Sequence, residues 1–231
     1  MEVYVGTSGW MYIWNPDGFD WYLVNSKLNA VELNASFYRF PFPSMVKSWA
    51  SKSRGKLRWA VKVSRWVTHV FKLSERAYST WMKFRELFKP LDDIVDFYLF
   101  QLPPQAAPTE SFVRRLEKFY RDSRLEERFA LEWRNLKWFL DKKWVKWAEE
   151  LGLTLVSVDS PEHPREIFCV NGIVYLRMHG REAWYAHYYE DEELIEVAEK
   201  IKETSPEKVY VFFNNNHAML ENAQRMLEIL G

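Results

Sequence analysis

The sequence contains a single cysteine, Cys169, and only 8 glycines among 231 residues. One cysteine excludes a disulfide framework and a zinc or iron–sulfur site built from several cysteines. Lysine and arginine total 32, as do aspartate and glutamate, so the net charge is zero and binding of polyanions through bulk charge is disfavoured. No run of about 18 apolar residues occurs, and Met1–Val5 shows no basic segment leading into an apolar one. We therefore expect a cytoplasmic protein without a membrane span.

Hydrophobic residues, in contrast, make up 48% of the chain and aromatic residues 17%, which is enough to bury a large core. No linker, low-complexity tract or change in composition divides the sequence, so we predict one domain over residues 1–231. Charged residues amount to 28% and glutamine is scarce, a composition typical of heat-adapted proteins.

Short β-rich segments alternate with charged helical segments along the whole chain. Eight strands are predicted, at Val3–Thr7, Ala30–Ser36, Trp59–Ser64, Asp96–Leu102, Phe129–Arg134, Leu153–Asp159, Val174–His179 and Lys208–Asn214. Helical patterns cover Glu75–Phe88, a segment capped by Thr109 or Ser111 and running to Tyr120, Lys142–Leu151, Asp191–Thr204 and His217–Leu230, whereas Ser160–Gly172 has none.

This alternation predicts an α/β fold with a single small (β/α)8 TIM-type barrel. An open, doubly wound sheet is the alternative. It is disfavoured because Gly6-Thr7-Ser8-Gly9, after the first strand, is not a dinucleotide-binding loop. No nucleotide cofactor is expected.

Functional groups of such barrels lie where the strands end, and alternate residues of a strand face the interior. In most of the predicted strands, the polar residues occupy one of the two alternating sets of positions. If that set faces the barrel interior, the inward polar residues are Glu32, Asn34, Lys62, Gln101, Glu132, Arg134, Ser157, Asp159, Arg177 and His179. The parity of Asn214-Asn215-Asn216, at the end of the eighth strand, stays open.

Three acidic and three basic side chains at one rim, among the residues just named, can be interpreted in two ways. They form a compensated ion network that plugs the barrel, or they form a ligand or catalytic site. We favour the site, because buried ion pairs seldom stabilise a protein more than apolar packing does.

The segments that carry these residues also form a familiar set, which resembles the YecE-like family, a domain of unknown function that is number seventy-two of its series. They are Gly6-Thr7-Ser8-Gly9-Trp10, Val31-Glu32-Leu33-Asn34-Ala35-Ser36-Phe37-Tyr38-Arg39, Ala60-Val61-Lys62, Phe100-Gln101-Leu102-Pro103-Pro104, Glu132-Trp133-Arg134, Asp159-Ser160-Pro161, Tyr175-Leu176-Arg177-Met178-His179-Gly180 and Phe213-Asn214-Asn215. The order is kept over nearly the whole chain. One departure is Asn135-Leu136-Lys137-Trp138, where members often carry His-Pro-Ser-Trp.

The resemblance implies a TIM barrel without a settled activity, related in structure to AP-endonuclease-like and xylose-isomerase-like barrels. The positions that it marks as shared and polar agree with the rim found by parity and add Thr7, Ser8, Tyr38, Tyr189, Asn214 and Asn215.

The rim offers two kinds of chemistry. Glu32, Glu132, Asp159 and His179 supply ligands for a divalent metal, but only one histidine is present and Arg134 and Arg177 compete for the carboxylates. Alternatively, Glu32, Lys62, Glu132, Asp159 and His179 act as acids and bases without a metal. A Schiff base on Lys62 is disfavoured on the expectation that neighbouring acids keep the amine charged.

We therefore hypothesise an enzyme acting on a small polar, phosphorylated or sugar-like ligand. Lys62, Arg134 and Arg177 would hold ligand charge, and the remaining residues would orient the ligand: Thr7, Ser8, Asn34, Tyr38, Gln101, Tyr189, Asn214 and Asn215. A nucleic-acid-binding or AP-endonuclease-like barrel is the second hypothesis, supported by basic and aromatic loops. A non-catalytic ligand sensor is the third.

Overall fold

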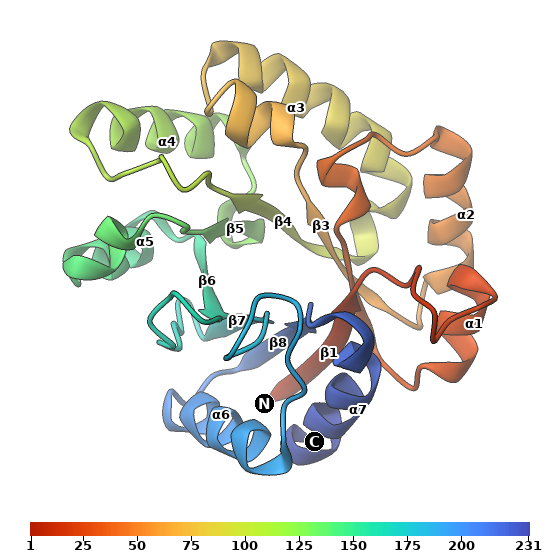
Figure 1. The fold of residues 1–231 in the computed structure, drawn as a ribbon. Coiled ribbons are helices and arrows are strands. Elements are labelled where there is room, and N and C mark those ends of the chain that lie inside the picture. Colours follow the sequence, from red (N-terminus) through yellow and green to blue (C-terminus); the bar gives the residue numbers. More distant parts are fainter.

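Eight parallel strands close into a barrel in the computed structural model, which describes residues 1–231. Each strand pairs with the next along the chain, and the last closes on the first, with Val3 opposite Val209 and Thr7 opposite Phe213. Figure 1 shows the strands in the middle of the molecule and the helices around them. The predicted barrel is confirmed. The strands are β1 (Glu2–Ser8), β2 (Ala30–Leu33), β3 (Arg58–Lys62), β4 (Val95–Gln101), β5 (Phe129–Glu132), β6 (Thr154–Asp159), β7 (Ile173–Met178) and β8 (Lys208–Phe213).

Helices cover the outside of the barrel. They are α1 (Gly18–Asn25), α2 (Pro43–Ser53), α3 (Glu75–Phe88), α4 (Glu110–Ser123), α5 (Lys143–Leu151), α6 (Asp191–Glu203) and α7 (Met219–Leu230). The five predicted helical segments correspond to α3 through α7. None of the helices combines the length and the apolar character that a membrane crossing requires.

Local sequence signals explain several helix ends. The Thr109 side chain accepts a hydrogen bond from the Phe112 amide at 3.3 Å, so Thr109 is the cap that begins α4. Gly152 ends α5 in the left-handed conformation, at φ 81°. Glu190 and Glu193 form a capping box at the start of α6.

The connection between β6 and β7 contains no helix, as predicted. Phe168 covers the barrel wall in its place, with its ring centroid 5.6 Å from that of Trp133. The Phe168 amide also donates to the Ser157 hydroxyl at 2.8 Å. A loop therefore takes the position that a helix occupies in the other units.

Alanines and aromatic residues together fill the barrel interior below the mouth, which is the open end at the carboxyl ends of the strands. Three alanines, from β2, β3 and β5, face Phe97, Tyr175, Tyr210 and Phe212, from β4, β7 and β8. The Phe97 ring centroid lies 5.1 Å from that of Tyr175 and 4.7 Å from that of Tyr210. This packed layer leaves the carboxyl ends of the strands as the polar end of the interior.

The first two strands approach each other closely at Gly6. A Cβ atom at that position would lie 2.2 Å from the Ala30 carbonyl oxygen. Glycine is therefore required there by the spacing of β1 and β2, which in turn places Ser8 beside Glu32.

Candidate active site at the carboxyl ends of the strands

The inward parity of the strands carries the polar side chains directly above the aromatic layer. Ala30, Ala60, Ala130 and Tyr175 belong to the inner core. Each is followed, two residues later, by an inward polar residue, and these residues are Glu32, Lys62, Glu132 and Arg177. The parity prediction is confirmed for β2, β3, β5 and β7.

Arg177 forms the centre of the site and is fully buried. Its Nε donates to Glu32 Oε2 at 2.8 Å and its Nη2 donates to Glu32 Oε1 at 2.7 Å. Its Nη1 donates to Glu132 Oε2 at 2.6 Å. One guanidinium therefore joins the carboxylates of two non-adjacent strands, β2 and β5, and burial of these charges is compensated by hydrogen bonds.

Glu32 receives two further hydrogen bonds. The Ser8 hydroxyl donates to Oε1 at 2.6 Å and the Tyr175 hydroxyl donates to Oε2 at 2.7 Å. Four hydrogen-bond donors therefore hold this carboxylate in a fixed orientation. Burial, followed by the Glu32 charge, raises the pKa of Tyr175 well above its ordinary value, so the tyrosine stays a donor.

Glu132 is bound from two sides. Arg177 lies on one side, and Arg134 Nε forms an ion pair with Glu132 Oε1 on the other. Burial raises the pKa of Glu132, but Arg134 and Arg177 outweigh burial and lower the pKa to about 2. The carboxylate is therefore ionised and is a weak base at neutral pH.

These contacts form the compensated ion network that was the alternative to a ligand site. The network accounts for Glu32, Glu132, Arg134 and Arg177, and it forms the floor of the barrel mouth. It does not account for the lysine, the histidine or the amides that lie around it.

Lys62 is outside the network. The ion pairs of the floor join Arg177 to both glutamates and Arg134 to Glu132. The Lys62 ammonium is in none of them; it lies 4.5 Å from the centroid of the Phe37 ring, and the residue is 9% exposed. Burial and the Arg177 charge lower the pKa of Lys62 to about 7, against the opposing effect of the two glutamates. The expectation that neighbouring acids keep the pKa of this amine high is wrong, because burial and the Arg177 charge together outweigh the two glutamates.

His179 is buried and neutral. Burial, with Arg177, Arg134 and Lys62 nearby, lowers the pKa of His179 well below its ordinary value. Arg134 Nη2 lies 3.2 Å from His179 Nε2. Because arginine only donates, Nε2 must accept and the proton must be on Nδ1, which has no hydrogen-bond partner.

Two amides border the mouth. Gln101 follows the inward Leu99 on β4, and its buried Oε1 has no partner. Asn34 Oδ1 lies 3.4 Å from Arg177 Nη2, at the limit of a hydrogen bond. Both residues are half-buried, so both can contact a ligand. Asn214 continues the inward parity of Phe212 and is half-buried as well.

Asp159 does not join this group. Val156 and Val158 are the inward residues of β6, so the parity predicted for Ser157 and Asp159 is wrong. Asp159 Oδ1 accepts from the Tyr189 hydroxyl at 2.9 Å, and Oδ2 accepts from Arg181 Nε at 3.1 Å. The carboxylate is thus bound on the side of the helices, where Arg181 also contacts Glu196 on α6.

Four other predicted residues lie outside the mouth. The Thr7 hydroxyl bonds to the Gly9 carbonyl and to the Tyr22 hydroxyl. Tyr189 bonds to Asp159 and to the Gly180 amide. Asn215 donates to the His187 carbonyl and to Asn222, and Tyr38 is 71% exposed. Thr7, Tyr189 and Asn215 therefore support loops, and their roles toward a ligand stay predictions.

The proposed metal ligands do not converge. Arg177 lies between Glu32 and Glu132, and Asp159 faces the helix layer. No group of three or more histidine, cysteine, aspartate or glutamate side chains has the arrangement of a metal site. This donor set, held by guanidinium groups, does not fit a divalent cation.

A cavity of about 640 Å³ adjoins the mouth on the side of β1 and β2. Ser8 and Asn34 form its border with the polar site, and its other walls are mostly apolar, including Trp10, Phe40 and Trp49. Arg39 also lines this cavity and lies 5.4 Å from the centroid of Phe42. The cavity can extend the binding surface for a ligand that reaches beyond the mouth.

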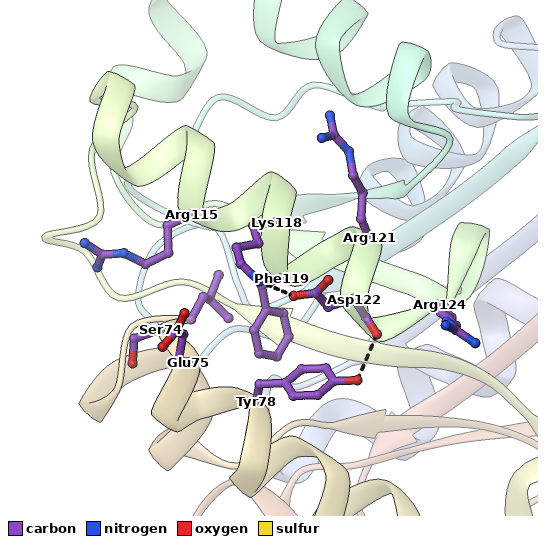
Figure 2. A pocket seen from close by; sticks show the side chains of 10 residues that line it. Ser74, Glu75, Tyr78, Arg115, Lys118, Phe119, Arg121, Asp122 and Arg124 are labelled. Atoms are coloured by element: carbon purple, nitrogen blue, oxygen red, sulfur yellow. Dashed lines mark hydrogen bonds and ion pairs between the residues drawn. The ribbon is translucent and has the colours of Figure 1, made fainter.

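A second hollow, of about 720 Å³, lies between α3 and α4 (Figure 2). Its charged side chains include Lys118, which bonds to Asp122 at 2.7 Å, and the Tyr78 hydroxyl bonds to the Asp122 carbonyl. None of the predicted site residues lines it. The chemistry of the mouth and this surface groove are therefore separate.

Sequence reasoning missed two residues of this region. Tyr175 has the inward parity of Arg177, which was a usable signal, but an aromatic residue in a strand is ordinarily core. Arg181, which neutralises Asp159, lies in a loop after β7 and gave no signal.

Solved structures with the same fold include two proteins of one family. A DUF72 family protein from Enterococcus faecalis V583 matches with a TM-score of 0.82 and 22% identity, covering 99% of this chain and 95% of the other. A DUF72 family protein from Thermotoga maritima MSB8 matches with a TM-score of 0.81 and 25% identity, covering 99% and 98%. No curated protein matches this chain in sequence.

A D-psicose 3-epimerase whose structure was determined in the presence of D-fructose also matches, with a TM-score of 0.61 and 9% identity over the full length of both chains. That likeness shows a shared fold. The family model described as "Protein of unknown function DUF72" matches residues 4–231. With the barrel and its rim in agreement, the chain belongs to the DUF72 family.

Proposed function

We propose that this protein is an enzyme that binds a small polyhydroxylated molecule at the barrel mouth and acts on it by acid–base chemistry without a metal. The observation that carries the proposal is Lys62, a buried amine outside every ion pair of the floor. Its pKa of about 7 allows it to gain or lose a proton near neutral pH.

The walls of the mouth supply the other half of the argument. Gln101 Oε1 and His179 Nδ1 are buried polar atoms without partners. Leaving such atoms unpaired is costly, and hydroxyl groups of a ligand would satisfy both an acceptor and a donor. Asn34, directly after β2, adds a half-buried amide.

The floor has a different role. Arg177 fixes the carboxylates of Glu32 and Glu132, so their positions set the electrostatic field in which Lys62 acts. Structures of the same fold include proteins described as epimerases with D-fructose and with D-tagatose, which supports a sugar as the ligand class. It supports no particular sugar.

Isothermal titration calorimetry tests this function with D-fructose, D-tagatose, D-ribose 5-phosphate and, as a contrasting ligand, an oligonucleotide with an abasic site. We expect binding of at least one sugar, weakened about ten-fold or more by Gln101→Leu, because that variant removes the amide but keeps the shape. Gln105→Leu, on the following loop, is the matched control and should bind like wild type. Binding of the oligonucleotide alone, falling steeply with salt, would overturn the proposal in favour of a nucleic-acid-binding barrel.

A further inference from the structure

We propose that Lys62 reacts through its amine nitrogen with the carbonyl group of an open-chain aldose or ketose and forms a Schiff base. This inference rests on the proposed function and names its substrate class. The geometry points to it because Lys62 is an amine at the end of β3 that makes no ion pair and lies over an aromatic ring.

Reactivity of an amine with a carbonyl requires an unprotonated nitrogen with a free lone pair. Every other charged group of the mouth is bound. Arg177 contacts both glutamates, and Arg134 contacts Glu132 and His179. Lys62 therefore has no carboxylate on its nitrogen to compete with a ligand, and its low pKa supplies the neutral form at pH 7.

The reaction balances without an oxidant or a reductant. The Nζ lone pair forms a C–N bond to the carbonyl carbon while the carbonyl π electrons move to oxygen, and the oxygen takes up a proton that the nitrogen releases. The resulting carbinolamine loses its hydroxyl group with a second proton as water and leaves a protonated C=N bond. Overall, a neutral amine, a carbonyl compound and one proton give an iminium ion and water.

The surroundings of Lys62 suit this product. The Glu132 and Glu32 charges act on the amine and favour its positive form. An iminium ion at the same place receives the same attraction from the two carboxylates. The Phe37 ring, 4.5 Å from Nζ, also attracts a cation. These contacts offset part of the cost that burial and the Arg177 charge place on a positive charge at Nζ.

The test traps the imine with sodium cyanoborohydride in the presence of dihydroxyacetone or D-glyceraldehyde. Modification of Lys62 blocks tryptic cleavage there and gives a peptide over residues 59–65, which mass spectrometry identifies. At pH 7 we expect at least about ten-fold more label on Lys62 than on the exposed Lys56, whose ammonium is not desolvated. Labelling of Lys62 should rise with pH to a plateau above about pH 7, whereas labelling of Lys56 should continue to rise.

Two variants complete the experiment. Lys62→Arg should lose the 59–65 label while the remaining lysines are labelled as before, and Lys56→Arg should leave the Lys62 label unchanged. Equal labelling of Lys62 and Lys56 at pH 7 would overturn the Schiff base, and sugar binding by calorimetry would still uphold the proposed function. Selective Lys62 labelling in a protein that binds no sugar would instead uphold the reactive amine and overturn the sugar as substrate.

Discussion

Arg177 and Glu32 bind each other through two parallel hydrogen bonds, of 2.8 and 2.7 Å, between β7 and β2. Both residues are fully buried, so bulk solvent does not reach either of them. The pair therefore fixes the orientation of the floor before any ligand arrives. A third hydrogen bond extends it to Glu132 on β5.

Removing the guanidinium should be severely destabilising. Arg177→Ala leaves two buried carboxylates without their common partner, and loss of one member of a buried pair costs about 3–5 kcal/mol. Urea denaturation followed by circular dichroism measures the change. Arg54→Ala, which breaks an exposed pair with Asp93, is the control and should change stability little. Similar losses in the two variants would contradict the buried network.

Acid should weaken the same floor. The pKa of Glu132 is lowered from 4.5 to about 2, so its contribution to stability is complete above pH 4.5 and is lost as the pH falls through 2. The contribution is on the order of 3 kcal/mol. Unfolding free energies measured between pH 6 and pH 2 should decrease in wild type and decrease less in Glu132→Gln. Parallel curves would show that Glu132 is not the group responsible.

Lys62 should also make stability rise with pH, but in a higher pH range and because its charged form is disfavoured in the folded protein. Its pKa in the folded protein, about 7, is below the ordinary 10.5, so the unfolded chain binds more protons between these values. The stability of wild type should therefore rise with pH from 7 toward 10.5. Lys62→Met should be more stable than wild type at pH 6, by an amount that shrinks as the pH approaches 10. Thermal unfolding at several pH values measures this, and a variant less stable at pH 6 would refute the buried, unpaired amine.

Asp159 should behave as a structural residue. Asp159→Asn weakens the contacts with Arg181 and Tyr189 and should lower stability. It should leave sugar binding and the labelling of Lys62 within about two-fold of wild type, because valines occupy the inward positions of β6. Loss of sugar binding at unchanged stability would show that Asp159 belongs to the ligand site after all.

The contact between the first two strands gives a prediction about backbone spacing. A methyl group at Gly6 would lie 2.2 Å from the Ala30 carbonyl oxygen, which is backbone and cannot turn away. Gly6→Ala should therefore cost at least about 1–3 kcal/mol, as overpacking does. Urea denaturation checks the value. An unchanged stability would mean that β1 and β2 separate more easily than their pairing indicates.

The strands and most of the mouth could be predicted because inward polar residues stand out in apolar strands. Glu32, between Val31 and Leu33, is an example. A carboxylate in a buried strand is costly unless a partner in the interior compensates its charge. The same rule failed for β6, where Asp159 is polar because it meets Arg181 from a loop far along the chain. Both faces of a barrel strand are buried. Which face a polar residue occupies is therefore ambiguous whenever a charged partner is also present on the outer face.

The state of Lys62 could not be predicted for a related reason. The sequence predicts two glutamates and two arginines near Lys62, but it does not indicate which of them bind each other. In the folded protein Arg177 joins both glutamates, which leaves the lysine to desolvation. The pKa of Lys62 depends on which of these charged groups pair with each other. That pairing is established only when the barrel closes.

The placement of Asp159 among the helices also changes the balance of charge at the mouth. The acids there are reduced to Glu32 and Glu132, against Arg134, Arg177 and Lys62. The mouth therefore carries one net positive charge when Lys62 is protonated and none when it is not. Near pH 7 the net charge of the mouth changes between these two values. A shift of about one pH unit therefore alters the preference of the site between an anionic and an uncharged ligand.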